Sequence, residues 1–76
     1  MITGDQLRAA RALLNWTQKE LAARAGVATR TIRLFESGSR NPYAQTIAQL
    51  QSALEDAGIE FLTTKAGVGV MLLQRA

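Results

Sequence analysis

The segment TQKELAARAGVATRTIRLFESG, residues 17–38 of this 76-residue chain, constrains the fold more than any other segment. Thr17 and Glu20 have the spacing of a capping box, so a helix is predicted to begin there. Gly26 can end that helix, because glycine adopts the positive φ of a helix terminus without strain. A second helix is predicted over residues 29–36, only a few residues later. The chain must therefore turn sharply between two short helices.

One further helix is predicted on each side of this segment. Thr3 and Gln6 form a second capping box, which predicts a helix over residues 4–14. Asn41 is a good helix cap and the proline after it is favoured in a first turn, so the last helix is predicted over residues 42–57. The side chains that are expected to form the core of these helices are Leu7, Ala10, Leu13, Leu14, Leu21, Ala22, Ala25, Ile32, Phe35, Ile47, Leu50 and Leu54.

The remainder of the chain has a different pattern. Residues 59–76 contain β-branched and aromatic side chains and two glycines, without a helical period. This pattern predicts a β-hairpin with strands over residues 59–63 and 68–73. A lone two-stranded hairpin is marginally stable in water, and this one would expose apolar side chains. The hairpin must therefore either pack on the helices of its own chain or pair with a second chain.

Composition excludes several classes of protein. The chain has no cysteine and no histidine, which removes disulfides, thiol nucleophiles and zinc-type ligand sets. No carboxylate pair and no nucleophile with a candidate base stands out, so we expect no enzymatic activity, no cofactor and no metal. A chain of this size forms one small domain. It has neither a signal-peptide pattern nor an apolar stretch that could span a bilayer, so we expect a cytoplasmic protein with no membrane partner.

Positive charge is concentrated in one part of the sequence. The net charge of +3 is modest, but residues 17–40 carry five basic and two acidic side chains. These side chains are Lys19, Arg24, Arg30, Arg33 and Arg40, with Glu20 and Glu36. A local basic excess suits a polyanionic partner such as a nucleic acid.

The segment TQKELAARAGVATRTIRLFESG closely resembles the Cro/lambda-repressor-type (XRE-type) helix-turn-helix, and residues 3–57 resemble the helical domain of that family. The resemblance implies a mainly α fold, a lambda-repressor-like bundle of four to five helices with a C-terminal β-hairpin or strand. Residues 1–58 would be the DNA-binding domain, and residues 59–76 an element for dimerisation or packing. The implied function is that of a transcriptional regulator that binds specific sequences in double-stranded DNA, expected to be a repressor acting as a homodimer.

The resemblance also implies roles for individual residues. Base contacts are implied for Ala28, Thr29, Arg30 and Arg33. Contacts with the DNA backbone are implied for Gln18, Thr31, Arg40 and Asn41. Thr17 and Lys19 are expected to join this second group, because helix N-termini and basic side chains hold phosphate. Arg11 and Glu36 match an ion pair of the family that connects the first helix to the end of the third.

Physical chemistry adds detail to the expected base contacts. Arg30 and Arg33 can each donate two hydrogen bonds to the O6 and N7 atoms of guanine. Ala28 stands where the family usually has serine or threonine, so its only base contact would be apolar, for example with a thymine methyl group. The same departure removes a side-chain cap from the helix over residues 29–36, unless Thr29 serves as the cap.

Alternatives remain open for the partner of the tail. Self-association is favoured, because one helix-turn-helix module reads few bases and a two-fold dimer would read two half-sites. The chain could instead be the antitoxin of a toxin–antitoxin pair, with the tail bound to a toxin. A third possibility is a protein-interaction module that keeps the fold without binding DNA.

Overall fold

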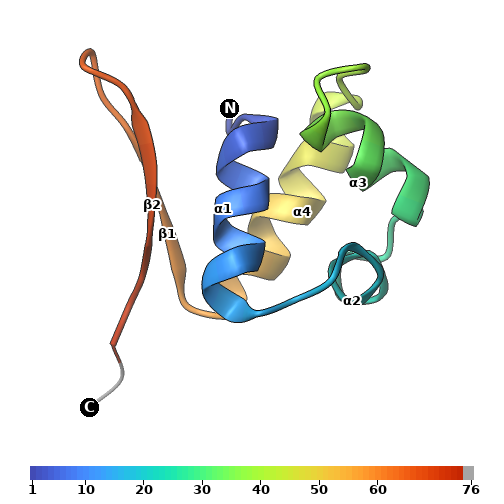
Figure 1. The fold of residues 1–76 in the computed structure, drawn as a ribbon, viewed down its shortest axis with the longest axis horizontal. Helices are drawn as coiled ribbons and strands as arrows, with labels where there is room; N and C mark the ends of the chain where they lie inside the picture. The colour runs from blue at the N-terminus through green and yellow to red at the C-terminus, as the bar shows by residue number, and fades with distance from the viewer. Residues whose placement is uncertain (75–76) are drawn as a thin grey trace.

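Four helices and an antiparallel hairpin follow one another along residues 1–74, the part of the chain that the computed structural model describes. The elements are α1 (Gly4–Leu14), α2 (Gln18–Ala25), α3 (Thr29–Glu36), α4 (Ala44–Asp56), β1 (Ile59–Thr63) and β2 (Val68–Leu72) (Figure 1). The predicted mainly helical fold with a C-terminal hairpin is therefore confirmed. Residues 75 and 76 of the predicted tail lie outside the described range. None of the described helices has the length and hydrophobicity that crossing a membrane requires.

The ends of the first two helices follow the local sequence. The Thr3 hydroxyl accepts from the N–H of Gln6, and the Thr17 hydroxyl accepts from the N–H of Glu20, with the reciprocal side-chain bonds also present. Gly26 ends α2 with φ 70°. Both predicted capping boxes and the glycine terminus are confirmed, because a cap depends on residues within one turn of it.

The predicted start of the last helix is wrong by two residues. Helix α4 begins at Ala44, not at residue 42, and neither Asn41 nor Pro42 belongs to it. Tyr43 is the N-cap residue, and its side chain makes no capping hydrogen bond. The ψ angle of Tyr43 is 152°, an extended conformation, so the first helical turn can form only after this residue.

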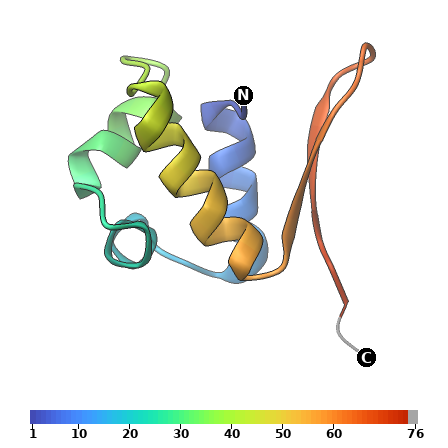
Figure 2. The same cartoon turned by 180° about the vertical axis from the view of Figure 1, so that it is seen from behind.

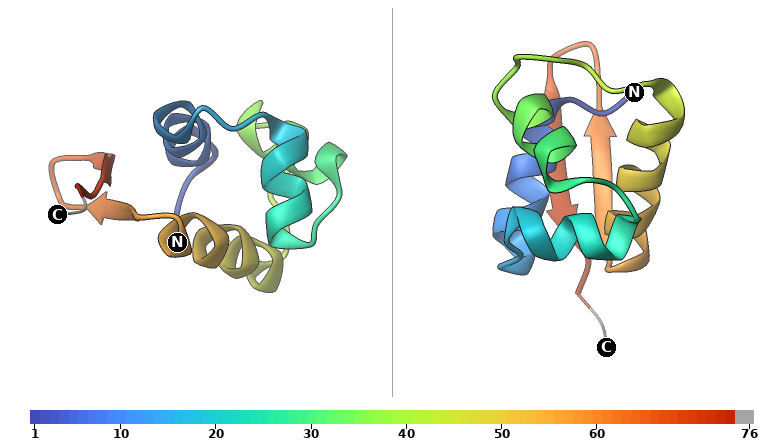
Figure 3. Two further views of the ribbon diagram at one scale, coloured as in Figure 1. Left: turned by 90° about the horizontal axis from the view of Figure 1, so that it is seen from below. Right: turned by 90° about the vertical axis from the view of Figure 1, so that its right-hand side faces the viewer.

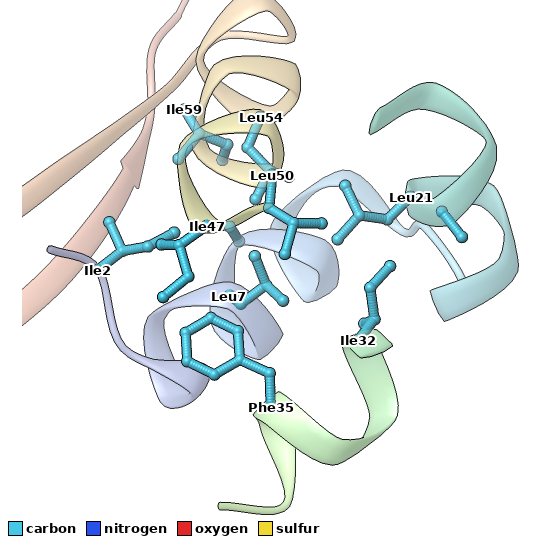
Figure 4. Close-up of a cluster of buried hydrophobic side chains, with 11 residues drawn as sticks. Ile2, Leu7, Leu21, Ile32, Phe35, Ile47, Leu50, Leu54 and Ile59 are labelled. Carbon is cyan, nitrogen blue, oxygen red and sulfur yellow. The ribbon is translucent and has the colours of Figure 1, made fainter. Parts of the chain in front are cut away.

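The four helices enclose one apolar core, and Figure 4 shows its side chains pointing toward one another from all of them. Leu7, Leu21, Ile32 and Leu50 are completely inaccessible to solvent. The prediction that Leu13 belongs to the core is wrong, since 44% of this residue is exposed. Consecutive helical side chains point about 100° apart, and it is the neighbouring Leu14 that packs against the core.

The hairpin covers the helices on one side of the molecule. Strand β2 lies next to α1, and β1 continues from α4 (Figure 1). Ile59 belongs to the core, while Phe61 and Val70 pack against it. The amide nitrogen of Gln6, Nε2, donates to the carbonyl oxygens of Leu62 at 3.1 Å and Gly69 at 3.0 Å. Because Gln6 is buried, these two bonds fix the middle of the hairpin to α1.

The hairpin and the α2–α3 pair lie at opposite ends of the molecule. Figures 1 and 2 show the hairpin beside α1, with α2 and α3 on the far side of the helical bundle. The longest dimension of the fold is 34 Å and lies along this direction. In the right-hand view of Figure 3, α2 and α3 face the viewer and the hairpin lies behind them.

Candidate nucleic-acid interface

Helix α3 has one buried face and one free face. Ile32 and Phe35 fill the core from the buried face, with 0% and 5% of each residue exposed. The residues predicted to contact bases are exposed on the rest of the helix and at its first end: Ala28, Thr29, Arg30 and Arg33. The two arginines are three positions apart and therefore lie on neighbouring turns of the same helix surface. Burial of the apolar face leaves this basic surface pointing away from the protein.

The start of α3 has no side-chain cap. Ala28 is the N-cap residue, and no side chain there accepts a hydrogen bond from the helix. Thr29 is already the first residue of the helix, so the idea that Thr29 caps α3 is wrong. Alanine at an N-cap is disfavoured relative to serine or threonine by about 1 kcal/mol. The exposed start of α3 therefore carries the methyl group of Ala28, although a serine or threonine at this position would stabilise the helix more.

The start of α2 is a second polar surface on the same side of the molecule (Figure 3). In the capping box, the N–H of Thr17 donates to the Glu20 carboxylate at 3.1 Å, and the N–H of Glu20 donates to the Thr17 hydroxyl at 3.0 Å. Among the hydrogen bonds of the described residues, none engages the N–H groups of Gln18 and Lys19. Free N–H groups and a positive helix end are the features that hold phosphate at helix N-termini.

A buried carboxylate joins three of the helices behind this surface. Arg11 donates from Nε to one oxygen of Glu36 and from Nη2 to the other, both at 2.7 Å. Its Nη1 donates to the carbonyl oxygen of Trp16 at 2.8 Å. Gln18 at the start of α2 donates to the same carboxylate at 3.2 Å. These bonds fix the end of α3 relative to α1 and to the start of α2.

The ion pair is poorly accessible to water. The side chain of Glu36 is 5% exposed and that of Arg11 is 16% exposed. The hydrogen bond to Glu36 and the attraction of its charge raise the pKa of Arg11 above its ordinary value, despite the opposing effect of burial. Arg11 is therefore charged at neutral pH. Because this charge is matched by Glu36, Arg11 supplies no free charge to the outer surface.

An open cavity of about 530 Å³ lies between α3 and the loop that leads to α4. It brings together Arg30 and Thr31 of α3 with Arg40 and Asn41 of the loop. The full set of lining residues is Arg30, Thr31, Leu34, Arg40, Asn41, Pro42, Tyr43 and Thr46. Arg33 and Thr29 do not line it. Of the α3 residues predicted to contact DNA, Arg30 and Thr31 therefore lie beside the loop, whereas Thr29 and Arg33 lie away from it.

Sequence reasoning gave no role to three residues that line this cavity. Tyr43 is 88% exposed, an unusual state for a large aromatic side chain. Leu34 follows Arg30 by one helical turn, and Thr46 belongs to the first turn of α4. Tyr43 follows a proline in an otherwise polar loop, and this aromatic side chain is the one local feature of the sequence that could have indicated the cavity. Leu34 and Thr46 give no such signal, because only the folded loop brings them to the cavity.

Comparison with protein families agrees with this geometry. The family model HTH_3, described as helix-turn-helix, matches residues 7–59, which extend from α1 to the first residue of β1. The chain therefore belongs to the Cro/lambda-repressor-type helix-turn-helix family. It is a DNA-binding helix-turn-helix regulator by this membership. A search of curated proteins found no match.

Proposed function

We propose that this protein is a transcriptional repressor that binds a specific sequence in double-stranded DNA as a homodimer. The observation that carries the proposal is the division of α3 into a buried apolar face and a free face with two arginines. A helix held in this way can enter the major groove, which is wide enough to admit it. Bound across a promoter, such a protein excludes other proteins from the same DNA without needing a catalytic group.

Arg30 and Arg33 are the proposed determinants of base preference. Each can form a bidentate contact with guanine, which discriminates against other bases by about 1–3 kcal/mol. Thr29 can bond to several bases, and the methyl group of Ala28 suits the methyl group of thymine. The lack of a side-chain cap supports a base contact for Ala28. Alanine makes α3 less stable than serine or threonine would, and what it offers instead is an exposed methyl group.

Two other surfaces are proposed to hold the DNA backbone. At the start of α2, Thr17, Gln18 and Lys19 would bind one phosphate through the free N–H groups and the lysine charge. Beside the cavity, Thr31, Arg40 and Asn41 would bind a second. The bond from Gln18 to Glu36 supports this arrangement, because it holds the start of α2 against the end of α3.

Selection of bound duplexes from a random pool tests the proposal most directly. The recovered sequences are expected to form a palindrome, since a two-fold dimer reads two copies of one half-site. Arg33→Ala should relax the preference at one position of each half-site. Lys19→Ala should weaken binding to all sequences alike and make the affinity less dependent on salt. Binding of every duplex with equal affinity at moderate salt would reject a sequence-specific regulator.

Arg24→Ala is a matched control for these variants. Arg24 is exposed and belongs to the last turn of α2, and its guanidinium lies over the Trp16 ring, 4.3 Å from the centroid. The substitution removes the same charge as Arg33→Ala does. We expect the base preference of the Arg24→Ala variant to equal that of the unmodified protein. A loss of preference equal to that of Arg33→Ala would mean that net charge, not position, governs binding.

Exposed apolar side chains on the hairpin favour one alternative function. Leu62, Val68, Met71, Leu72 and Leu73 are between 38% and 52% exposed. In an antitoxin, this surface would bind a toxin while the helices repressed the shared operon. Such a protein would co-purify with a small toxic partner encoded by an adjacent gene. A module that binds only proteins would show no salt-sensitive affinity for duplex DNA.

A further inference from the structure

Two basic side chains without a partner line the cavity between α3 and the loop that follows it. Arg30 comes from the helix and Arg40 from the loop, and both residues are exposed. Within the described part of the chain, the basic side chains that form ion pairs are Arg8 and Arg11. The hydrogen bonds that guanidinium groups donate there also belong to these two residues. The charges of Arg30 and Arg40 are therefore available to a ligand.

Of the described residues that line this cavity, none is acidic. Two other cavities on the surface differ in this respect, because one is lined by Asp5 and Glu36 and the other by Asp56. The lining of the cavity beside α3 therefore brings two positive charges together without a negative one. Guanidinium groups donate pairs of hydrogen bonds to carboxylate and phosphate groups, so this lining suits an anion.

Part of the lining is apolar. Leu34 and Pro42 are partly buried, and Tyr43 is 88% exposed. Pockets that bind small molecules combine apolar walls with a few polar groups and have volumes of about 300–1,000 Å³. The cavity, at about 530 Å³, lies in this range. A phosphate group alone would engage the arginines and leave the apolar wall without a partner. The lining therefore suits an anion that also carries a planar apolar group, which can stack on the tyrosine ring.

Backbone hydrogen bonds hold both walls of the cavity in place. The carbonyl oxygen of Leu34 accepts from the N–H groups of Ser39 at 3.0 Å and Arg40 at 3.3 Å, which fixes the loop to the end of α3. The carbonyl oxygen of Tyr43 accepts from the N–H of Ile47 at 3.1 Å, in the first turn of α4. Because these bonds order the walls before a ligand arrives, binding costs less conformational entropy.

We propose that this cavity binds a small organic anion with a planar apolar group, and that the bound anion releases the protein from DNA. The two arginines hold the charged group, and the apolar wall covers the planar group. The release rests on the proposed function, in which Thr31, Arg40 and Asn41 hold a phosphate of the DNA backbone. These three residues line the same cavity. Because one set of side chains cannot hold both partners at once, the anion and the DNA compete.

Titration of the full chain with phenyl phosphate, followed by amide chemical shifts in NMR spectra, tests the binding site. Phenyl phosphate joins a charged group to a planar ring. Inorganic phosphate lacks the ring, and benzyl alcohol lacks the charge. We expect phenyl phosphate to bind at least about tenfold more tightly than either of these compounds. The saturable shifts should be concentrated at the amides of Thr31, Leu34, Arg40 and Thr46, which line the cavity.

Two substitutions in the cavity assign the contacts, and a third substitution is their control. Arg40→Gln removes one charge and should weaken phenyl phosphate binding by about tenfold. Tyr43→Ala removes the exposed ring and should weaken it by about threefold to tenfold. Arg24→Gln removes the same charge as Arg40→Gln but lies outside the cavity, so it should leave the affinity within about twofold. Both cavity side chains are exposed, and circular dichroism checks that each variant is folded.

Several results would overturn the binding site. One is an affinity for inorganic phosphate or benzyl alcohol equal to that for phenyl phosphate. Another is a set of shifts that lie mainly outside the cavity. Equal weakening by Arg40→Gln and Arg24→Gln would show that net charge, not the cavity, attracts the anion. The lack of saturable binding at about 10 mM phenyl phosphate would also reject the site.

Competition with DNA tests the release and separates it from the proposed function. With phenyl phosphate at about ten times its dissociation constant, the apparent dissociation constant of a selected duplex should rise about tenfold. Inorganic phosphate at the same ionic strength corrects for screening. An unchanged duplex affinity would overturn the release. Binding of phenyl phosphate in the cavity of a protein that selects no duplex would reject the proposed function and leave the ligand site. Specific duplex binding without phenyl phosphate binding would do the reverse.

Discussion

Replacing Arg11 with alanine is expected to cost about 3–5 kcal/mol of stability, because it leaves a buried carboxylate without its partner. The substitution removes both 2.7 Å bonds to Glu36 and the 2.8 Å bond to the Trp16 carbonyl oxygen. Glu36 would keep one side-chain bond to its carboxylate, from the neutral amide of Gln18. Water cannot compensate well, since 5% of the Glu36 side chain is exposed.

The expected loss is large relative to the stability of a small domain. At about 0.05–0.15 kcal/mol per residue, a chain of this length is stabilised by roughly 4–11 kcal/mol. For domains of this size, each kcal/mol shifts the Tm by about 4–8 °C. The variant should therefore melt at least about 12 °C lower, and it could be unfolded at room temperature. Urea denaturation followed by far-UV circular dichroism measures the difference in unfolding free energy.

Two further variants test whether the unpaired charge of Glu36 causes the loss of stability in Arg11→Ala. Arg8→Ala is the matched control, because the pair of Arg8 with Asp5 has side chains that are 56% and 79% exposed. Exposed pairs contribute about 0–1 kcal/mol, and the other bond of Arg8 is a long one, 3.3 Å, to the main-chain carbonyl oxygen of Glu36. This variant leaves the Glu36 carboxylate paired, so it should lose far less stability than Arg11→Ala. Combining Arg11→Met with Glu36→Leu removes the unpaired charge and should restore much of the lost stability. A loss below about 1 kcal/mol for Arg11→Ala alone would refute the reasoning.

Other predictions concern packing at named positions. Gly4→Ala should destabilise the fold by about 1–3 kcal/mol although alanine favours helices, because the added Cβ would overlap the Phe35 carbonyl oxygen; thermal denaturation measures the change. Gln6→Ala should lower stability by about 1–3 kcal/mol and speed amide hydrogen exchange in the hairpin, and unchanged exchange there would contradict the proposed anchoring. Leu50→Ala should reduce the unfolding free energy by about 2–5 kcal/mol in urea titrations, since Leu50 is fully buried.

The elements of the fold could be predicted wherever their determinants lie close together in the sequence. Thr3 and Thr17 each bond a backbone group three residues away, so the starts of α1 and α2 are visible in short segments. The sharp turn at Gly26 follows from one residue that adopts φ 70°. The hairpin follows from the strand pattern on each side of its turn. The exposed face of α3 follows because its apolar residues recur at helical spacing.

The remaining features depend on which surfaces meet. The sequence alone places Leu13 and Leu14 equally well in the core, and only packing shows that Leu14 is the one that contacts it. Asn41 and Pro42 by themselves are compatible with a helix that begins at residue 42. In the structure, the backbone of Tyr43 is extended, so α4 begins at Ala44. The cavity beside Tyr43 likewise exists only after the loop has returned along α3.

The sequence by itself determined the class of fold, the ends of α1 and α2 and the residues of the free α3 face, because hydrogen bonds and side-chain periodicity within a few residues specify them. Only the tertiary structure decided that Gln6 holds the hairpin, that Gln18 shares the Glu36 carboxylate, and that the hairpin lies opposite α3. Those contacts join residues up to 63 positions apart. These contacts form only when the whole chain packs around one core, so a short segment of sequence cannot predict them.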